Sequence, residues 1–464
     1  MADPTKIKQK PNLIKQRIIT LLIILLWSIK GNAQKKPNII FLLTDDHRWD
    51  AVGFNGNTII KTPNLDRLAS RGVVFRNAFV VSSICCSSRA SILTGQYMAR
   101  HGVNTFDIDL STEQLRLTYP LILKQAGYQT GFIGKYGVGL NHPASFFDYW
   151  QCPPTYQPDY ESYDQEKRPI HHTDLISNQI DEAITQFSAT DKPFCLSVSF
   201  KAPHCQDGDP RQFIYHPRYD SLYQNVKISK SETTKPAYWD YFPEYFKENN
   251  EGRNRWTLRF DTEEKYQQMV KAYYRLITQV DDVVGNMMQK LKEAGLDENT
   301  IIIFMGDNGF FLGEHGLAGK WFPYEESIRV PLMVYDPRQS TGRRYDQMVL
   351  NIDIAPTILR YADIPVPETM QGKPLQNLLA GQSKNWRRSF YYEFRFPPFP
   401  QHCEALVTDR YKYIVYPKTQ PLFEELYDLR EDPLETKNRI NLENHYKIKK
   451  QLVRKFKVAQ KAAK

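Results

Sequence analysis

Two adjacent cysteines begin the short segment ICCSSRASILTG, residues 84–95, and raise the question of what chemistry they do. Vicinal cysteines rarely pair with each other, because their Cα atoms are too close and poorly oriented for a disulfide. One interpretation is that one thiol is a small buried apolar side chain and the other pairs elsewhere. The other interpretation is that one of them is a reactive centre. Arg89 stands four residues after Cys85 and places a cation near such a centre.

Hard oxygen ligands follow two apolar runs, residues 37–43 (PNIIFLL) and residues 301–305 (IIIFM). These side chains are Asp45, Asp46, Asp307 and Asn308. Carboxylates packed together repel one another, and an all-oxygen set suits Ca²⁺ or Mg²⁺ better than zinc. The alternative is ordinary turn chemistry, in which Asp and Asn cap the loops after strands.

The elements that must position these residues are short buried strands alternating with helices. Residues 194–200 (FCLSVSF) form a third apolar run, and helical patterns cover residues 64–71, 173–187 and 265–294. Continuous apolar runs predict strands buried on both faces, and their alternation with helices predicts an α/β doubly wound sheet. Polar residues at the carboxyl ends of its strands would converge on one crevice.

The sequence pattern changes after about residue 375. Residues 389–395 and 405–416 read as strands, the second run as a hairpin, which predicts a small C-terminal antiparallel sheet closed by a helix. We therefore expect a catalytic domain over residues 34–375 and a small α+β subdomain with a basic tail over residues 376–464. The aromatic-rich residues 205–260 are expected to form an irregular excursion over the active face. Their rings would either stack on sugars or cover the core.

Both ends of the chain are basic. The formal net charge is +9, of which residues 1–33 carry +5 and residues 447–464 carry +8, leaving −4 for the body. Residues 1–33 combine basic residues, an apolar run and a small-residue end, which predicts a signal peptide rather than a buried core helix. The basic tail is expected to be a solvated terminal helix, although its charge could also attract polyanions or acidic lipids.

The amino-acid composition indicates which class of protein this is. The chain is 41% hydrophobic and 13% aromatic, which fits a globular protein. We expect a periplasmic or secreted protein with no membrane span after signal removal, because the N-terminal apolar run is shorter than the ~20 residues that a span needs. The six cysteines leave their connectivity open. No Cys/His spacing resembles a zinc site, and nothing indicates a nucleic-acid partner.

Residues 85–89 followed by Leu93-Thr94-Gly95 resemble the signature of the formylglycine-dependent (type I) sulfatases. The family's other motifs follow in order between about residues 36 and 440. They are TDD at 44–46, Gly134-Lys135, APH ending at His204, Gly306-Asp307-Asn308-Gly309 leading through GEHG to Lys320, and LYDLREDPLETKN at 426–438. The doubled cysteine and GKY at 134–136 look most like the branch of glucosamine-6-sulfatases and heparan endosulfatases. The resemblance implies an alkaline-phosphatase-like sheet.

The resemblance also implies roles for individual residues. A formylglycine-generating enzyme would oxidise Cys85 to the formylglycine nucleophile and leave Cys86 as a structural thiol. A Ca²⁺ ion, with Mg²⁺ as the second choice, would be held by Asp45, Asp46, Asp307, Asn308 and the oxidised position 85. Arg89 would stabilise the nucleophile. Lys135 and Lys320 would bind the sulfate, and His204 would protonate the leaving alcohol. His315 in GEHG is a further candidate for substrate contact.

Two positions depart from the family pattern. Ser87 stands where the signature usually has Pro or Ala. Gly137 stands where many members have a histidine that helps to return the sulfated diol to the aldehyde, although the branch named above also lacks it. His142 could take over that role. Arg48 and Trp49, just after the metal aspartates, could face a sugar subsite.

The expected reaction is therefore the hydrolysis of sulfate esters on a sulfated carbohydrate outside the cytoplasm. Two rivals stay open. One is a phosphodiester or phosphonate hydrolase of the same superfamily, since tetrahedral sulfate and phosphate esters differ mainly in charge. The other is a catalytically inactive polyanion-binding protein, which would bind without turnover and keep Cys85 unmodified.

Overall fold

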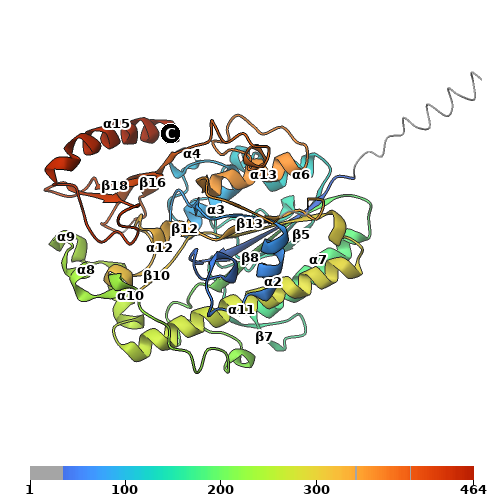
Figure 1. Cartoon of the computed structure of the whole chain (residues 1–464). Coiled ribbons are helices and arrows are strands. Elements are labelled where there is room, and N and C mark those ends of the chain that lie inside the picture. Colours follow the sequence, from blue (N-terminus) through green and yellow to red (C-terminus); the bar gives the residue numbers. More distant parts are fainter. Residues whose placement is uncertain (1–34, 340–341, 398) are drawn as a thin grey trace, which may run out of the picture. The chain divides into compact units, whose positions relative to one another are not determined.

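Three parallel strands run through the middle of the protein. In the computed structural model, which describes residues 35–339, 342–397 and 399–464, β1 (Asn38–Asp45) lies between β8 (Phe194–Pro203) and β9 (Thr300–Gly306) (Figure 1). It pairs in parallel with both. All residues of these strands are buried, which is why β1 and β9 are apolar almost throughout, whereas β8 also buries Ser197, Ser199 and Lys201.

The full sheet is mixed. Its strand order is β14-β2-β13-β9-β1-β8-β4-β5, and β13 runs antiparallel to both β9 and β2. The outer strands are β14 (Arg343–Tyr345), β2 (Val73–Phe75), β13 (Leu332–Tyr335), β4 (Gln129–Gly134) and β5 (Tyr149–Gln151). The α/β sheet expected from the sequence is confirmed.

Helices cover both faces of this sheet. The side chains of Ile40 and Leu42 pack into the core under α2 (Pro63–Arg71), α7 (His172–Ser188) and α11 (Glu263–Glu293). Those of Ile39, Phe41 and Leu43 pack on the opposite face, under α3 (Cys85–Thr94), α6 (Tyr119–Gln125) and α13 (Ile354–Tyr361). Figure 1 shows the two helical layers on either side of the strands. β1 is apolar on both faces because each face meets one of these layers.

The C-terminal residues form the predicted antiparallel sheet. β16 (Ser389–Phe394), β17 (Cys403–Thr408), β18 (Tyr411–Tyr416) and β19 (Phe423–Asp428) pair in sequence order. α15 (Tyr446–Ala463) packs on this sheet through Leu452 and Phe456, which are buried against Tyr391 and Tyr413. The terminal helix is therefore amphipathic and docked on one face, rather than solvated all round.

The excursion over residues 205–260 is made of loops and short helices. These are η3 (Pro217–Tyr219), η4 (Glu232–Thr234), α8 (Pro236–Asp240), α9 (Glu244–Lys247) and α10 (Glu251–Arg259). Phe242 and Phe246 are buried and stack with their centroids 4.1 Å apart. Tyr219 and Tyr223 are also buried, so these four rings cover the core.

The remaining elements are short. They are η1 (Gly53–Asn55), β3 (Ala78–Phe79), α4 (Met98–His101), α5 (Thr112–Arg116), η2 (Ala144–Phe146), β6 (Glu161–Tyr163), β7 (Pro169–His171), η5 (Asp297–Asn299), β10 (Phe311–Leu312), η6 (Glu314–Gly316), β11 (Ala318–Gly319), α12 (Glu325–Ile328), β12 (Arg329–Val330), β15 (Val349–Leu350), η7 (Asn351–Asp353), α14 (Gln376–Leu379) and η8 (Glu443–His445).

Residues 37–464 form one compact unit, and the domain boundary expected at residue 375 stays a prediction. The expected signal peptide, residues 1–33, lies outside the described residues. Among the helices of the described ranges, none has both the length and the hydropathy to cross a bilayer. All six cysteines are free thiols.

Candidate active site

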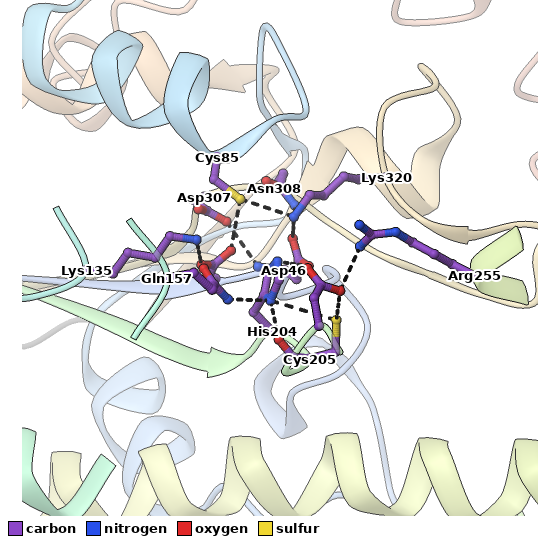
Figure 2. Close-up of polar contacts among 12 residues, drawn as sticks. Asp46, Cys85, Lys135, Gln157, His204, Cys205, Arg255, Asp307, Asn308 and Lys320 are labelled. Carbon is purple, nitrogen blue, oxygen red and sulfur yellow. Dashed lines mark hydrogen bonds and ion pairs between the residues drawn. The ribbon is translucent and has the colours of Figure 1, made fainter. Parts of the chain in front are cut away.

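The carboxyl ends of four neighbouring strands bring the expected site residues together. Asp45 ends β1, Lys135 follows β4, His204 follows β8 and Asp307 follows β9. Because these strands are parallel and adjacent, their ends meet at one edge of the sheet. All four side chains are buried, and Figure 2 shows those of Lys135, His204 and Asp307 pointing toward one another with Cys85 and Lys320.

The oxygen side chains form a tight buried group. Asp46 takes a left-handed backbone conformation, φ 60°, which turns the chain at the end of β1. Its amide nitrogen donates to Asp307 Oδ1 at 3.1 Å, and its Oδ1 accepts from Asn308 Nδ2 at 2.6 Å. Burial and the charge of Asp45 raise the pKa of Asp307 to about 7. Three acids in such a place require neighbouring positive charge to stay ionised.

One polar atom in this group is left without a partner. Asn308 Oδ1 is buried and accepts no hydrogen bond. Ligand atoms of Asp45, Asp46, Cys85 and His204 also lie within 4.8 Å of one another. Carboxylates around an unpaired amide oxygen match the donor set of a hard divalent cation. The residues present therefore fit the expected metal.

Cys85 is the first residue of α3 and lies at the centre of the cluster. It is 1% exposed, its Sγ donates to Asp45 Oδ1 at 3.2 Å, and Lys320 Nζ lies 3.1 Å from the same sulfur. Burial raises the pKa of this thiol well above its usual value, and Asp45 adds to the effect. Cys86 packs instead in the core with Phe41 and has a pKa raised to about 11 by burial. The two thiols therefore occupy different environments.

Three cations surround the acids. Arg89 is 2% exposed and donates through Nε to Asp307 Oδ2 at 2.9 Å and through Nη1 to the Lys135 carbonyl at 2.7 Å. Lys135 is ion-paired with Asp45. Lys320 is ion-paired with Asp46. Burial alone would raise the pKa of Asp45, but the charge of Lys135 and the other cations holds it well below its usual range.

His204 closes the cluster opposite Cys85. Its Nε2 lies 3.4 Å from Asp46 Oδ2, while its Nδ1 lies 2.6 Å from the Cys205 carbonyl and 2.7 Å from Gln157 Nε2. Burial lowers the pKa of this imidazole to about 4, although Asp46 opposes the shift. The side chain is held on one edge, so that Nε2 faces the acids and Nδ1 the loop.

Two contacts of the site were not predicted from the sequence. Gln157 holds His204 from an irregular loop that carries no motif. Ser199 contacts Arg89 Nη1 from within β8. Serines inside a buried strand, here Ser197 and Ser199 of β8, were the available signal for the second contact.

Two further histidines have aromatic surroundings. His315 is 3% exposed, has φ 55° and stacks on Tyr324 with centroids 4.5 Å apart. Its other ring contacts are with Tyr238 and Phe311, and burial lowers its pKa to about 3. The ring of His142 packs against those of Tyr136 and Trp150, with centroids 5.5 Å and 5.9 Å away. Substrate contact by His315 and a catalytic role for His142 stay predictions.

Gly137 is packed directly against the cations of the site. Its φ is +68°, and a Cβ built on it would lie 2.9 Å from Arg89 Cδ and 3.5 Å from Lys135 Cε. A side chain at position 137 would displace the Arg89 guanidinium.

Arg48 and Trp49 lie at a separate cleft of about 880 Å³. Arg48 is ion-paired with Asp50 and with Glu314 at 2.8 Å. The guanidinium of Arg329 lies 4.0 Å from the centroid of the Trp49 ring. Since Arg48 is 8% exposed and doubly paired, it serves the local structure, and a sugar subsite at this pair stays a prediction.

Comparison with known proteins identifies the chain. Residues 37–364 match the family described as Sulfatase. The chain belongs to the sulfatase family. Residues 313–462 match the family described as N-sulphoglucosamine sulphohydrolase, C-terminal.

Individual relatives agree with this assignment. The sulfatase is 29% identical to an N-acetylglucosamine-6-O-sulfatase of Bacteroides thetaiotaomicron over 92% of this chain and 87% of that protein. A solved structure described as a complex with its substrate D-glucosamine-2-N,6-O-disulfate is 28% identical, covers 92% of this chain and 98% of that one, and has a TM-score of 0.78. A phosphonate monoester hydrolase of Agrobacterium radiobacter shares the fold at 22% identity, with coverage of 92% and 96% and a TM-score of 0.76.

Several predictions from the sequence are thereby confirmed. The chain is a type I sulfatase of the glucosamine-6-sulfatase-like branch, its fold is that of the family, and its enzymatic class is sulfuric ester hydrolase. The roles of the individual site residues are not settled by these similarities and belong to the proposal below.

Proposed function

We propose that this sulfatase hydrolyses sulfate esters on a sulfated carbohydrate, with a formylglycine made from Cys85 as nucleophile and a Ca²⁺ ion as cofactor. The observation that carries the proposal is the position of Cys85 Sγ, within 3.2 Å of both the Asp45 carboxylate and Lys320 Nζ. An oxygen in place of this sulfur would lie between a metal-binding acid and a sulfate-binding cation. The relatives named for glucosamine sulfates support a sulfated amino sugar as the substrate class.

The metal would be held by Asp45, Asp46, Asp307 and Asn308, with the modified position 85 completing the set. The unpartnered Asn308 Oδ1 and the raised pKa of Asp307 support this assignment, since both would be relieved by a cation. Bound Ca²⁺ would supply a positive charge that lowers the pKa of a hydroxyl on position 85 and turns it into a nucleophile at neutral pH.

The cations of the chain would bind and orient the sulfate. Lys135 and Lys320 lie on two sides of Cys85, one beside Asp45 and the other beside Asp46. Their ammonium groups would hold two sulfate oxygens and align the sulfur with position 85. Negative charge moves onto these oxygens as the ester bond breaks, and fixed cations in a buried site oppose that charge strongly. Arg89, tied to Asp307 at 2.9 Å, would keep position 85 and the acids in register.

His204 would act as general acid. As the bond between sulfur and the alcohol oxygen breaks, the electron pair goes to that oxygen, which takes a proton from His204 Nε2. Burial lowers the pKa of the free imidazole to about 4, and the charge of a bound sulfate ester would favour its protonated form. Position 85 would then carry the sulfate on one of its two hydroxyl oxygens. The bond from its carbon to that oxygen breaks, the second hydroxyl gives its proton to the departing hydrogen sulfate, and the aldehyde re-forms. Water adds to this aldehyde and restores the hydrate, so that the sum of the reaction is one ester and one water giving one alcohol and one hydrogen sulfate.

Maturation and location are part of the proposal. A formylglycine-generating enzyme would convert Cys85, and it would have to accept Ser87 in the signature. Export by residues 1–33 would place the sulfatase in the periplasm or outside the cell, where sulfated glycans are found.

The first test is the mass of the tryptic peptide of residues 77–89 from protein produced together with a formylglycine-generating enzyme. We expect formylglycine at position 85 and an unchanged Cys86. Release of sulfate from glucosamine 6-sulfate should be abolished in Cys85→Ala, whose fold is checked by circular dichroism. Faster release of the alcohol from a phosphonate monoester or a phosphodiester than from the corresponding sulfate ester would replace this proposal by the hydrolase alternative. Two intact cysteines together with binding but no turnover would favour the polyanion-binding alternative.

A further inference from the structure

α15 carries a continuous line of positive charge that the catalytic proposal does not use. Five of its basic residues, together with Lys464 directly after it, are spaced three or four positions apart, which places them along one side of a helix. This cationic stripe consists of Lys447, Lys450, Arg454, Lys457, Lys461 and Lys464. All six residues are exposed. With a rise of about 1.5 Å per residue, the stripe is about 26 Å long.

The stripe has no acidic counterpart. Residues 446–464 contain no Asp or Glu. Within the described part of the chain, none of the six side chains forms an ion pair, whereas Lys449 on the flank is paired with Glu424 at 2.6 Å. Like charges three and four positions apart destabilise a helix, as do cations in its first turn. A helix that only needed solubility would gain from alternating acids and bases.

The opposite face of α15 is already occupied. Leu452, Phe456 and Ala463 are buried in one apolar cluster with rings of the C-terminal sheet. A basic amphipathic helix that binds a membrane surface inserts its apolar face between lipids. Because that face is packed against protein here, the free side of α15 is mainly charged, and Tyr446 and Val458 are its exposed apolar side chains. This argues for a polyanion in solution rather than a lipid surface.

We infer that the cationic stripe is a docking surface for the sulfated polysaccharide from which this enzyme removes sulfate. The choice of partner rests on the proposed function, because a sulfated glycan chain carries repeated anions along its length. The stripe would hold such a chain near the enzyme and raise the local concentration of its sulfate esters at the active site. It needs no contact with the reacting sulfate.

The end of the stripe lies close to elements that lead to the site. The carbonyl of Lys464 accepts from Arg100 Nε at 3.3 Å, and Arg100 belongs to α4. α4 follows α3 along the chain, and α3 begins at Cys85. Figure 1 shows α15 on the outside of the C-terminal sheet, with α4 between its end and α3. A polysaccharide held on the stripe is therefore kept on this part of the enzyme.

The test compares two quadruple variants of the whole mature enzyme. In the stripe variant, Lys450, Arg454, Lys457 and Lys461 become Gln, which keeps the helix propensity. In the matched control, four scattered exposed lysines, Lys61, Lys192, Lys227 and Lys292, become Gln, so that the net charge changes equally. Binding to heparin is measured over a range of NaCl concentrations, and thermal unfolding checks both folds.

We expect the stripe variant to bind heparin at least about tenfold more weakly, with a shallower dependence of log Kd on log salt, because polyanion binding releases counterions in proportion to the cations engaged. Its KM for heparan sulfate should rise while turnover of glucosamine 6-sulfate stays unchanged, and the control should resemble wild type.

Equal heparin binding by the wild type and the stripe variant would overturn the inference, as would an equal loss in both variants. Tighter binding of the wild type to phosphatidylserine vesicles than to heparin at the same salt would replace the glycan by a membrane surface. Heparin binding needs no turnover, so an enzyme that releases no sulfate but binds through the stripe refutes only the proposed function.

Discussion

Replacing Gly137 by alanine should damage the site out of proportion to the size of the change. The new Cβ would lie 2.9 Å from Arg89 Cδ, closer than real Cβ contacts allow, and at a tight 3.3 Å from Arg89 Nε. The guanidinium cannot retreat easily, because it is 2% exposed and held by Asp307, Ser199 and the Lys135 carbonyl. We therefore expect Gly137→Ala to shift Arg89 and to loosen its hold on Asp307.

The magnitude has two parts. A non-glycine residue in the left-handed conformation costs about 1–2 kcal/mol. Forcing an extra methyl group into a packed interior costs about 1–3 kcal/mol more. The free energy of unfolding should fall by about 2–5 kcal/mol. Because a misplacement of about 1 Å in a catalytic constellation can cost 10²-fold in rate, kcat/KM should fall by roughly that factor.

Gly295 provides a matched control. Its φ is +67°, against +68° at Gly137, but a Cβ built there meets nothing within 4 Å. Gly295→Ala should therefore show the backbone cost alone, about 1–2 kcal/mol, with unchanged kcat/KM. Gly137→His, which introduces the residue found in many family members, should lose at least as much activity as Gly137→Ala.

The assay combines urea unfolding with kcat/KM on 4-nitrocatechol sulfate for the three variants and the wild type. Equal stability and equal kcat/KM of the Gly137→Ala and Gly295→Ala variants would refute the reasoning, since the close approach to Arg89 would then have no consequence.

Three other predictions concern the metal, acid pH and a buried ion pair. Removal of divalent cations with EGTA should abolish sulfate release and lower the melting temperature, and Ca²⁺ should restore both better than Mg²⁺; full activity after chelation would exclude the metal. Burial lowers the pKa of His101 to about 3, so the stability that its neutral form contributes is complete above its unfolded pKa of about 6.5 and is lost as pH falls toward 3. Between pH 7 and 5, the free energy of unfolding measured in urea should fall by about 2 kcal/mol more for the wild type than for His101→Gln. The same pH dependence in both proteins would contradict this. Lys412 is fully buried between Glu325 at 3.0 Å and Glu435 at 2.7 Å, so Lys412→Met should lower the free energy of unfolding by about 3–5 kcal/mol. Lys235→Met, which removes an exposed ion pair, should have a much smaller effect, and similar losses would show that burial is not the cause.

The central strands could be predicted from the sequence because burial on both faces leaves an unbroken apolar run. β1 and β9 have this property, whereas Ser197 and Ser199 interrupt the apolar run of β8. β2 and β14 are only three residues long and give no such signal, and their place at the sheet edge depends on pairing between distant segments. β19 was also missed as a strand, because its sequence FEELYD is half acidic.

The buried carboxylate of β19 is stabilised by side chains from distant parts of the chain. Glu425 is fully buried, and hydroxyl groups of Tyr324, Tyr416 and Tyr427 donate to its carboxylate. Partners so far apart in the chain cannot be read from a local pattern. From the residue types alone, a buried glutamate such as Glu425 is therefore predicted to be exposed.

The candidate active site likewise has residues that the sequence predicts and contacts that it does not. Asp45, Asp307 and His204 could be placed together because each directly follows a strand whose direction was predictable. The aromatic surroundings of His315 and the support of His204 by Gln157 depend on how loops pack. The docked face of α15 was missed for a related reason, since its apolar residues are few among many lysines.

The burial of Cys85 determines whether its modification comes before or after folding. A side chain that is 1% exposed at the head of a helix, beneath Lys320, is out of reach of another enzyme once folding is complete. The proposed oxidation must therefore finish while this segment is still extended. The rate of modification at position 85 therefore competes with the rate of folding. A molecule that folds before it is modified keeps an unmodified Cys85. The fraction of active molecules would then record the relative speeds of synthesis and modification, and adding the maturing enzyme to folded protein would not raise it.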